Sequence, residues 1–424
     1  MKSHSKTTLW AWSFYDWANT AFGTVILTFI YSVYFAKGIV GDETYAASIW
    51  SYAIAISGFI IAICSPVIGA IADQTGRRKP WIFGFNLICV CATAALWFGE
   101  PGASEASIFL ILCLIIIGNI GFEMAIVFYN AMLPDLSTPK NIGKISGFAW
   151  GLGYFGGLGC LIAALFFLIG LGPISPLLTL PTENSEHIRA AALLTAIWIF
   201  LFSLPLFLYV PERKTGAISY AQVVQRGLAD LASTLKHIRQ EKNLALFLVS
   251  SALYRDGLNT LFAIGGIYAA GQYGMGFEHI LIFAIGLNVT SGLGAFLFAY
   301  LDDHQGSKPT ILVSLSGLVF TGILILLTSD MWVFIALAMV LGIFIGPAQA
   351  AGRTLCGRLA PADKVTQIYG FYALTGKSIA FLGPLFYGIA TEIFQSQQAG
   401  MLTIIGFWGV GALILLMVKE GARH

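Results

Sequence analysis

Charged side chains are scarce in this sequence. Only 10% of its 424 residues are Asp, Glu, Lys or Arg, whereas 57% are hydrophobic, and the mean hydropathy is +0.81. Soluble domains carry about 25% charged residues, so this composition excludes a water-soluble globular protein. The net charge of +2 is small and the basic residues are dispersed, which excludes a nucleic-acid-binding patch.

Motifs of soluble enzymes are missing as well. No segment that could face water contains a Walker loop, a catalytic triad, a dinucleotide fingerprint or a metal-binding cluster. The six cysteines all lie in apolar runs, without the spacing of a zinc site or a disulfide framework. We therefore expect a protein that is not an enzyme and that needs no cofactor or metal ion.

Long apolar runs, by contrast, are abundant. A helix needs roughly 20 apolar residues to cross the hydrocarbon core of a bilayer. The runs here are continuous, unlike the short alternating segments of a membrane β-barrel, so they predict twelve membrane-spanning helices. These lie near residues 10–35, 46–72, 81–99, 106–133, 145–171, 190–210, 244–270, 279–301, 310–328, 331–353, 366–391 and 399–418.

The positive charges are distributed unevenly between the loops. With loops assigned alternately to the two sides, 18 of the 23 Lys and Arg residues lie on the side of the amino terminus, and only Lys37 and Arg189 lie opposite. Because loops rich in positive charge stay in the cytoplasm, we expect both termini there. The longest polar stretch, 211–243, has apolar residues at helical spacing and predicts an amphipathic helix on the cytoplasmic membrane surface.

Internal repetition relates the two parts of the chain on either side of this stretch. The pattern Asp-x-x-Asn-Thr at residues 16–20 recurs at 256–260, which is 240 positions later. The pattern Asp-x-x-Gly-x-Arg at 73–78 recurs with a final Lys at 303–308. Two repeats of six spans are typical of the major facilitator fold, in which substrate binds between the halves near mid-membrane.

We therefore predict an all-α membrane protein with twelve transmembrane helices in two pseudo-symmetric six-helix bundles. The amino-terminal bundle would span 1–210 and the carboxy-terminal bundle 244–424, joined by a cytoplasmic amphipathic linker at 211–243.

Several stretches resemble a known family. Residues 69–79 are similar to the loop between spans two and three of the major facilitator superfamily, although Gln74 stands where the family pattern has Arg. A closer resemblance is to the vacuole-effluxer-like branch, founded on the autophagy-related vacuolar amino-acid exporters of fungi. The stretches that carry it are 15–19, 129–134, 147–157, 254–257 and 370–384.

The resemblance implies a secondary transporter that works by alternating access and exports amino acids or similar small zwitterions. The compact loops resemble those of bacterial members, which implies a multi-pass protein of the bacterial cytoplasmic membrane. Its partners would be a small-molecule substrate, the lipid bilayer and, as candidate coupling ion, the proton; we expect a monomer. Import of another solute, such as a sugar, peptide or siderophore, stays open, as does a non-transporting membrane receptor.

Ionisable residues inside the spans are candidate functional groups. An unpaired charge at the bilayer centre costs at least about 3 kcal/mol, so such residues must pair or line a wet cavity. Asp16 and Asp256, with Asn19 and Asn259 on the same helical faces, are candidates for binding a substrate ammonium group or taking up a proton. Alternatively, each carboxylate only holds a neighbouring helix through a basic residue.

Arg255 and Lys377 are the candidates for binding a substrate carboxylate, with neutralisation of adjacent carboxylates as the alternative. Acidic and basic groups together would form a cradle for a zwitterion. Aromatic side chains near these charges could wall the cavity or serve as packing. They are Tyr15, Trp17, Trp150, Tyr154 and Tyr254.

A second set of residues is predicted to act as gates near the cytoplasmic face. Glu123 and Arg353 occupy matched points of spans four and ten, and we expect them to meet when this side closes, unless each has a separate partner in its own half. Asp73, Arg77 and Arg78 form a candidate latch, with orientation of the chain as the alternative role.

Glycines recur every four residues along span five and also occur on span eight. They are Gly143, Gly147, Gly151, Gly153 and Gly157 on span five, and Gly286, Gly292 and Gly294 on span eight. Such strips let helices approach closely. We expect them to form a sliding surface between spans five and eight.

Overall fold

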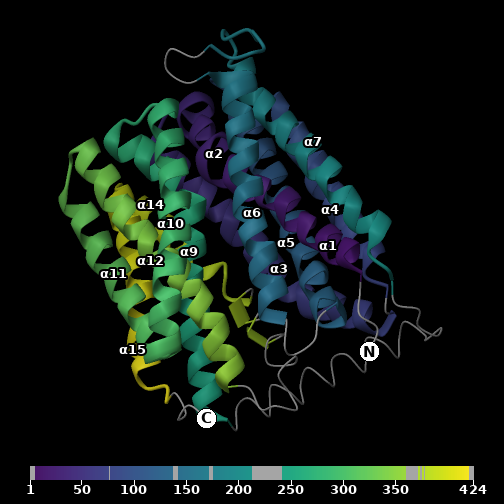
Figure 1. Cartoon of the computed structure of the whole chain (residues 1–424). Coiled ribbons are helices and arrows are strands. Elements are labelled where there is room, and N and C mark those ends of the chain that lie inside the picture. Colours follow the sequence, from purple (N-terminus) through teal and green to yellow (C-terminus); the bar gives the residue numbers. More distant parts are fainter. Residues whose placement is uncertain are drawn as a thin grey trace. The chain divides into compact units, whose positions relative to one another are not determined.

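The structure is a computed structural model that describes residues 5–75, 77–136, 142–170, 175–212, 241–359, 371–372, 375–376 and 378–419. Within these ranges the regular structure is helical, with no strand (Figure 1). The chain separates into two compact units, Met1–Ala46 with Ile63–Ala229, and Ala47–Ala62 with Asp230–His424. We call them unit 1 and unit 2.

The helices of the first half follow the predicted spans in order. They are α1 (Lys6–Ala21), η1 (Phe22–Phe29), α2 (Tyr31–Tyr34), η2 (Phe35–Val40), α3 (Glu43–Thr75), α4 (Lys79–Ala95), η3 (Leu96–Phe98), α5 (Glu105–Leu136), α6 (Ile142–Ala164), η4 (Leu165–Ile169) and α7 (Glu186–Tyr209). The middle of α3, Ala47–Ala62, is assigned to unit 2.

The second half contains six helices within the described residues. They are α9 (Lys242–Tyr273), α10 (Phe277–Gln305), α11 (Ser307–Leu327), α12 (Met331–Leu359), α14 (Leu382–Phe394) and α15 (Gln397–Leu416).

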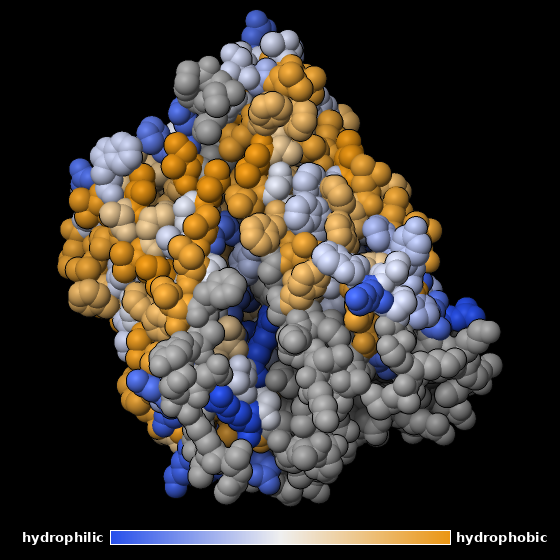
Figure 2. All heavy atoms as spheres, in the orientation of Figure 1, coloured by the Kyte–Doolittle hydropathy of each residue, from blue (hydrophilic) through white to orange (hydrophobic). Residues whose placement is uncertain are grey.

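Each of the twelve predicted spans coincides with helix in the described part of the chain, and nine helices there are long and apolar enough to cross a membrane. The predicted all-α membrane fold is thus confirmed. Many large apolar side chains point outward, as lipid contact requires (orange in Figure 2). Residues 213–240, which hold most of the predicted amphipathic linker, lie outside the described residues.

The eleventh predicted span, 366–391, is interrupted. The chain turns at residues 379–381 before α14 begins at Leu382. Phe381 occupies the N-cap position of α14, and its side chain makes no capping hydrogen bond. A helix start leaves backbone N–H groups without partners inside the helix, so the first turn of α14 needs an acceptor from another element.

The two repeats anchor their last helices in the same way. Lys79, at the start of α4, donates from Nζ to the Phe207 carbonyl of α7 at 2.9 Å. Lys308, at the start of α11, donates to the carbonyls of Leu416 and Val418 at 2.9 and 2.6 Å. A cation at a helix carboxy terminus satisfies free carbonyls and complements the helix dipole, and each unit uses a lysine in this way.

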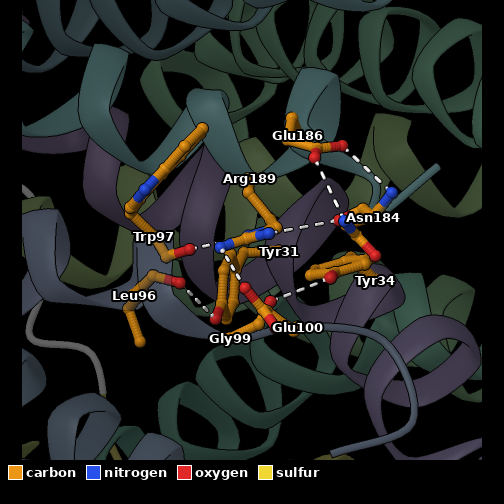
Figure 3. Close-up of polar contacts among 9 residues, drawn as sticks. All are labelled: Tyr31, Tyr34, Leu96, Trp97, Gly99, Glu100, Asn184, Glu186 and Arg189. Carbon is orange, nitrogen blue, oxygen red and sulfur yellow. Dashed lines mark hydrogen bonds and ion pairs between the residues drawn. The ribbon is translucent and has the colours of Figure 1, made fainter. Parts of the chain in front are cut away.

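A buried arginine ties together chain segments at one end of unit 1 (Figure 3). The Arg189 side chain donates to the carbonyls of Trp97 and Asn184 and contacts the Glu100 carboxylate at 3.4 Å. Nearby, Tyr31 and Tyr34 donate to carbonyls at 96 and 99, each at 2.8 Å. We refer to these contacts as the Arg189 network.

Gly153 of span five and Gly286 of span eight lie against helices of their own unit, and the expected sliding surface between the two spans stays a prediction. A β-carbon on Gly153 would stand 3.3 Å from the Asp16 β-carbon of α1. A β-carbon on Gly286 would stand 2.6 Å from the Met339 sulfur of α12. These glycines allow close packing within each unit, because no side chain separates the neighbouring helices.

Candidate functional site

The repeated Asp-x-x-Asn-Thr motif has the same local geometry in both copies. Thr20 Oγ1 donates to the main-chain oxygen of Asp16 at 2.8 Å, and Thr260 Oγ1 donates to that of Asp256 at 2.8 Å. This back-bonding to residue i−4 is common for threonine within helices. Each threonine proton is thus engaged within its own helix, and the hydroxyl oxygen is left as an acceptor.

The Asp16 carboxylate of α1 is half-buried and is held by a residue of α5. Tyr129 donates from its hydroxyl to Asp16 Oδ2 at 3.1 Å. The Tyr129 ring is fully buried between Trp12, stacked at 4.4 Å, and Tyr15, at 4.8 Å. A fixed hydroxyl donor stabilises negative charge on a carboxylate, so this arrangement suits an ionised Asp16.

Tyr15 is fully buried and connects α1 to two further helices. Its hydroxyl donates to Asn86 Oδ1 of α4 at 3.4 Å, and Asn86 Nδ2 donates to Ser203 Oγ of α7 at 3.1 Å. The structure therefore places Tyr15 in the packed interior of unit 1, behind the Asp16 carboxylate. Its predicted position in a cavity wall stays a prediction.

Asp256, the matching residue of α9, has a different environment. Its side chain is fully buried, and Oδ2 accepts the backbone N–H of Gly383 at 2.7 Å. Oδ1 has no hydrogen-bond partner among the described residues. The carboxylate therefore supplies the acceptor that the first turn of α14 lacks on its own.

Arg255 extends toward the chain segment that precedes α14. Its Nη1 donates to the Tyr372 carbonyl at 3.0 Å, and the guanidinium lies 4.4 Å above the Tyr372 ring. Tyr254 is fully buried, and its hydroxyl lies beside Gly352 of α12. The predicted pair Tyr254 and Arg255 is thus packed within unit 2.

The remaining candidate binding residues are only partly brought together. Asn19 is buried whereas Asn259 is exposed, so the two copies of the motif differ at this position. Tyr154 is half-buried on α6. The side chains of Trp150 and Lys377 lie outside the described residues.

The structure likewise shows contacts for only some of the predicted gating residues. Arg78 forms an ion pair with Asp135 at the end of α5, at 2.6 Å, and Arg77 is exposed. Glu123 and Arg353 are half-buried on α5 and α12, and their predicted meeting stays a prediction. The Asp73 side chain lies outside the described residues.

Unit 2 also has an ion pair at helix ends. Arg358, at the end of α12, contacts Asp302 near the end of α10 at 3.2 Å.

Sequence reasoning did not single out three partners that define these environments: Tyr129, Gly383 and Tyr372. Tyr129 and Gly383 lie in stretches that carried the family resemblance, 129–134 and 370–384, and this was the available signal. Among the described residues, no group of three or more potential metal ligands occurs.

Comparison with known proteins identifies the family. A family model described as vacuole effluxer Atg22 like matches residues 32–422. A protein of Bacillus subtilis (strain 168), described as the uncharacterized MFS-type transporter YxiO, is 28% identical and covers 97% of this chain and 94% of its own length. Autophagy-related protein 22 of Coccidioides immitis (strain RS) is 23% identical, with 91% of this chain and 75% of that protein covered.

Solved structures of transporters share the fold. A D-xylose-proton symporter aligns with a TM-score of 0.69 at 14% identity, over 98% of each chain. A bacterial homologue of the human lysosomal transporter Spinster aligns with a TM-score of 0.68 at 15% identity, over 99% of this chain and 97% of its own. At these identities the likeness shows the fold alone. The chain belongs to the vacuole effluxer Atg22-like family and is a multi-pass membrane transporter of the major facilitator type.

Proposed function

We propose that this transporter exports small zwitterionic solutes such as amino acids, by alternating access and at the expense of an ion gradient. The observation that carries the proposal is the setting of Asp16, a half-buried carboxylate within a span whose charge is supported by the Tyr129 hydroxyl. An anion stabilised in this way would attract a substrate ammonium group, because opposite charges interact strongly where water is scarce.

The substrate carboxylate would require a cation. Arg255 and Lys377 are the candidates, and Asn19, Asn259, Tyr15, Trp150, Tyr154 and Tyr254 complete the proposed binding set. Arg255 already donates to a carbonyl and stacks on Tyr372. It would therefore contribute through its remaining N–H groups, since guanidinium carries five donors.

Gating belongs to the same proposal. Glu123 and Arg353 would pair when the cytoplasmic side closes, and Asp73, Arg77 and Arg78 would act as a latch there. We place the protein as a monomer in the cytoplasmic membrane of a bacterium, with both termini in the cytoplasm. The alternatives are import of a sugar, peptide or siderophore, or a receptor without transport activity.

The first experiment is a ligand screen by thermal unfolding of the purified protein. Amino acids, short peptides, sugars and siderophores are added separately, and a bound solute raises the unfolding temperature by mass action. An amino-acid shift that is lost in Asp16→Asn supports the proposal. Asp330→Asn is the matched control, because Asp330 is an exposed carboxylate that caps α12 through Oδ1, an acceptor that asparagine retains.

Transport is then measured with the solute identified in the screen. The protein is reconstituted in liposomes, and flux of labelled solute is compared between wild type, Asp16→Asn and Asp330→Asn. Flux of a sugar or siderophore, but of no amino acid, would favour the importer alternative. Binding without flux of any solute would favour the receptor.

A further inference from the structure

Asp256 is a carboxylate buried more completely than the proposed function requires. Its relative exposure is 0%, while Asp16 at the matching position is half-buried. Transferring an ionised carboxylate from water into a protein interior costs several kcal/mol unless its oxygens are well paired. Of the two oxygens, Oδ2 is paired with Gly383 N–H, and Oδ1 has no partner among the described residues.

The described surroundings of Asp256 contain no cation directed at it. On α14 the neighbour is the backbone of Gly383, and the titratable groups of that helix, Tyr387 and Glu392, come later in the sequence. On α15 the ring of Trp408 packs beside Gly257, the next residue of α9.

The titratable residues of α9 and α12 include Tyr254, which is buried beside Gly352 of α12, and the following three. Arg255 on α9 is turned toward Tyr372. Cys356 is buried on α12, where Arg353 is half-buried. Among the described residues, Gly383 N–H is the one hydrogen-bond donor to the Asp256 carboxylate.

We propose that Asp256 is the proton-carrying group of the transport cycle, whereas Asp16 remains ionised and meets the substrate ammonium group. This inference rests on the proposed function and deepens it by assigning different roles to the two copies of one motif. The proton binds at Oδ1, where the buried lone pairs have no described donor, and converts the carboxylate to a neutral acid.

The geometry favours a proton over a metal cation. Hard cations such as Ca²⁺ and Mg²⁺ take about six or more oxygen ligands, whereas the described site offers one carboxylate and an N–H group. A proton needs one lone pair and one acceptor. Both Thr260 Oγ1 and Asp256 Oδ1 face Gly383, where a β-carbon would stand against the threonine oxygen and 3.0 Å from Asp256 Oδ1.

Protonation would also change how α9 holds α14. A hydrogen bond to an ionised carboxylate is roughly twice as strong as one between neutral groups, and the positive end of a helix dipole favours negative charge. A neutral Asp256 therefore binds the first turn of α14 less strongly than an ionised one. Span eleven is interrupted at this point, so the proton-binding site lies at a helix start.

A purely structural role for Asp256 is the main competitor. Asparagine also accepts hydrogen bonds from helix N–H groups and is a good capping residue, but it cannot carry a proton. Asp256→Asn therefore preserves the proposed cap and removes the proposed proton site. Asp16→Asn is the equivalent change in the other repeat.

The experiment uses the full-length protein in liposomes with a labelled mixture of L-amino acids as probe. Net flux driven by a pH gradient is compared with exchange of the same amino acids at equal pH on both sides. For Asp256→Asn we expect the response to the pH gradient to fall by about tenfold or more while exchange stays within about twofold of wild type. For Asp16→Asn we expect both modes to fall. A full pH-gradient response in Asp256→Asn would overturn the inference.

A second measurement does not depend on transport. Difference infrared spectroscopy of the purified protein during a pH titration detects the carbonyl band of a protonated carboxylic acid. We expect a band that is missing in Asp256→Asn and retained in Asp16→Asn. If wild type moves no amino acid, the proposed function fails, yet this band still tests Asp256; an unchanged band in Asp256→Asn would refute the assignment.

Lys377 provides the remaining control, because it precedes α14 in the sequence. If Lys377 neutralises Asp256, Asp256→Asn leaves an unpaired lysine, and Lys377→Gln in that background should restore the pH-gradient response. Restoration would contradict the proton-carrying role. Because Lys377 also belongs to the proposed binding set, Lys377→Gln is measured alone as well; persistent loss in the double variant, with exchange retained in Lys377→Gln, would support it.

Discussion

Arg189 Nε donates a hydrogen bond to the Trp97 carbonyl at 2.6 Å, and its guanidinium carbon lies 4.8 Å from the centre of the Trp97 ring (Figure 3). The arginine is only 4% exposed, whereas its ionic partner Glu100 is largely exposed. Backbone carbonyls and an aromatic ring therefore hold this charge more than the ion pair does. The Arg189 side chain thus joins chain segments, and it is one of the two basic residues predicted to lie on the side opposite the amino terminus.

Replacing Arg189 with glutamine should destabilise unit 1. The variant loses the cation–ring contact and leaves buried carbonyls with fewer donors, so we expect a loss of about 2–3 kcal/mol. Glu100→Gln should cost less than about 1 kcal/mol, because an exposed partner contributes little. Thermal unfolding in detergent measures the stability of both variants. Equal losses of stability would contradict the expectation that Arg189 matters more than Glu100.

The Tyr129 hydroxyl should affect substrate affinity more than stability. Tyr129→Phe keeps the stacking on Trp12 and removes the donor to Asp16. We expect substrate binding to weaken by about tenfold, the scale of one hydrogen bond to a charged group, with a changed pH profile of transport. Tyr31→Phe, which removes a hydroxyl from the Arg189 network, should leave the affinity and the pH profile unchanged.

A methyl group at Gly156 should force α1 and α6 apart. Its β-carbon would overlap the main chain of Trp17, whereas a β-carbon on Gly84 has no neighbour within 4 Å. We expect Gly156→Ala to destabilise the protein by about 1–3 kcal/mol, and Gly84→Ala to stabilise it by up to about 1 kcal/mol through helix propensity. Comparing unfolding midpoints of the two variants tests this, and similar midpoints would show that α1 adjusts freely.

The Arg78–Asp135 ion pair should contribute modestly to stability because Asp135 is 41% exposed. A double-mutant cycle with Arg78→Ala and Asp135→Ala should give a coupling of about 0.5–1 kcal/mol. The coupling should shrink at high salt, because exposed charges are screened. A coupling several times larger, or one insensitive to salt, would indicate that the pair is more enclosed than its exposure suggests.

The sequence was sufficient for the helical membrane fold and for the family. Long apolar runs have few alternatives in lipid, since backbone polar groups must be satisfied within the segment, and the described helices coincide with the predicted spans. The sequence was less informative about the interruption of span eleven. The apolar run continues across residues 379–381, and no proline before Pro384 signals the turn that ends one helix and starts α14.

By itself, the sequence determined that two copies of Asp-x-x-Asn-Thr lie within helices. Only the tertiary structure decided that Asp16 receives a tyrosine hydroxyl and stays half-buried, whereas Asp256 receives a backbone N–H and is fully buried. The physical reason is the separation along the chain between the residues in contact. A helical motif fixes contacts three or four residues away, while Tyr129 and Gly383 reach the two carboxylates from 113 and 127 positions along the chain.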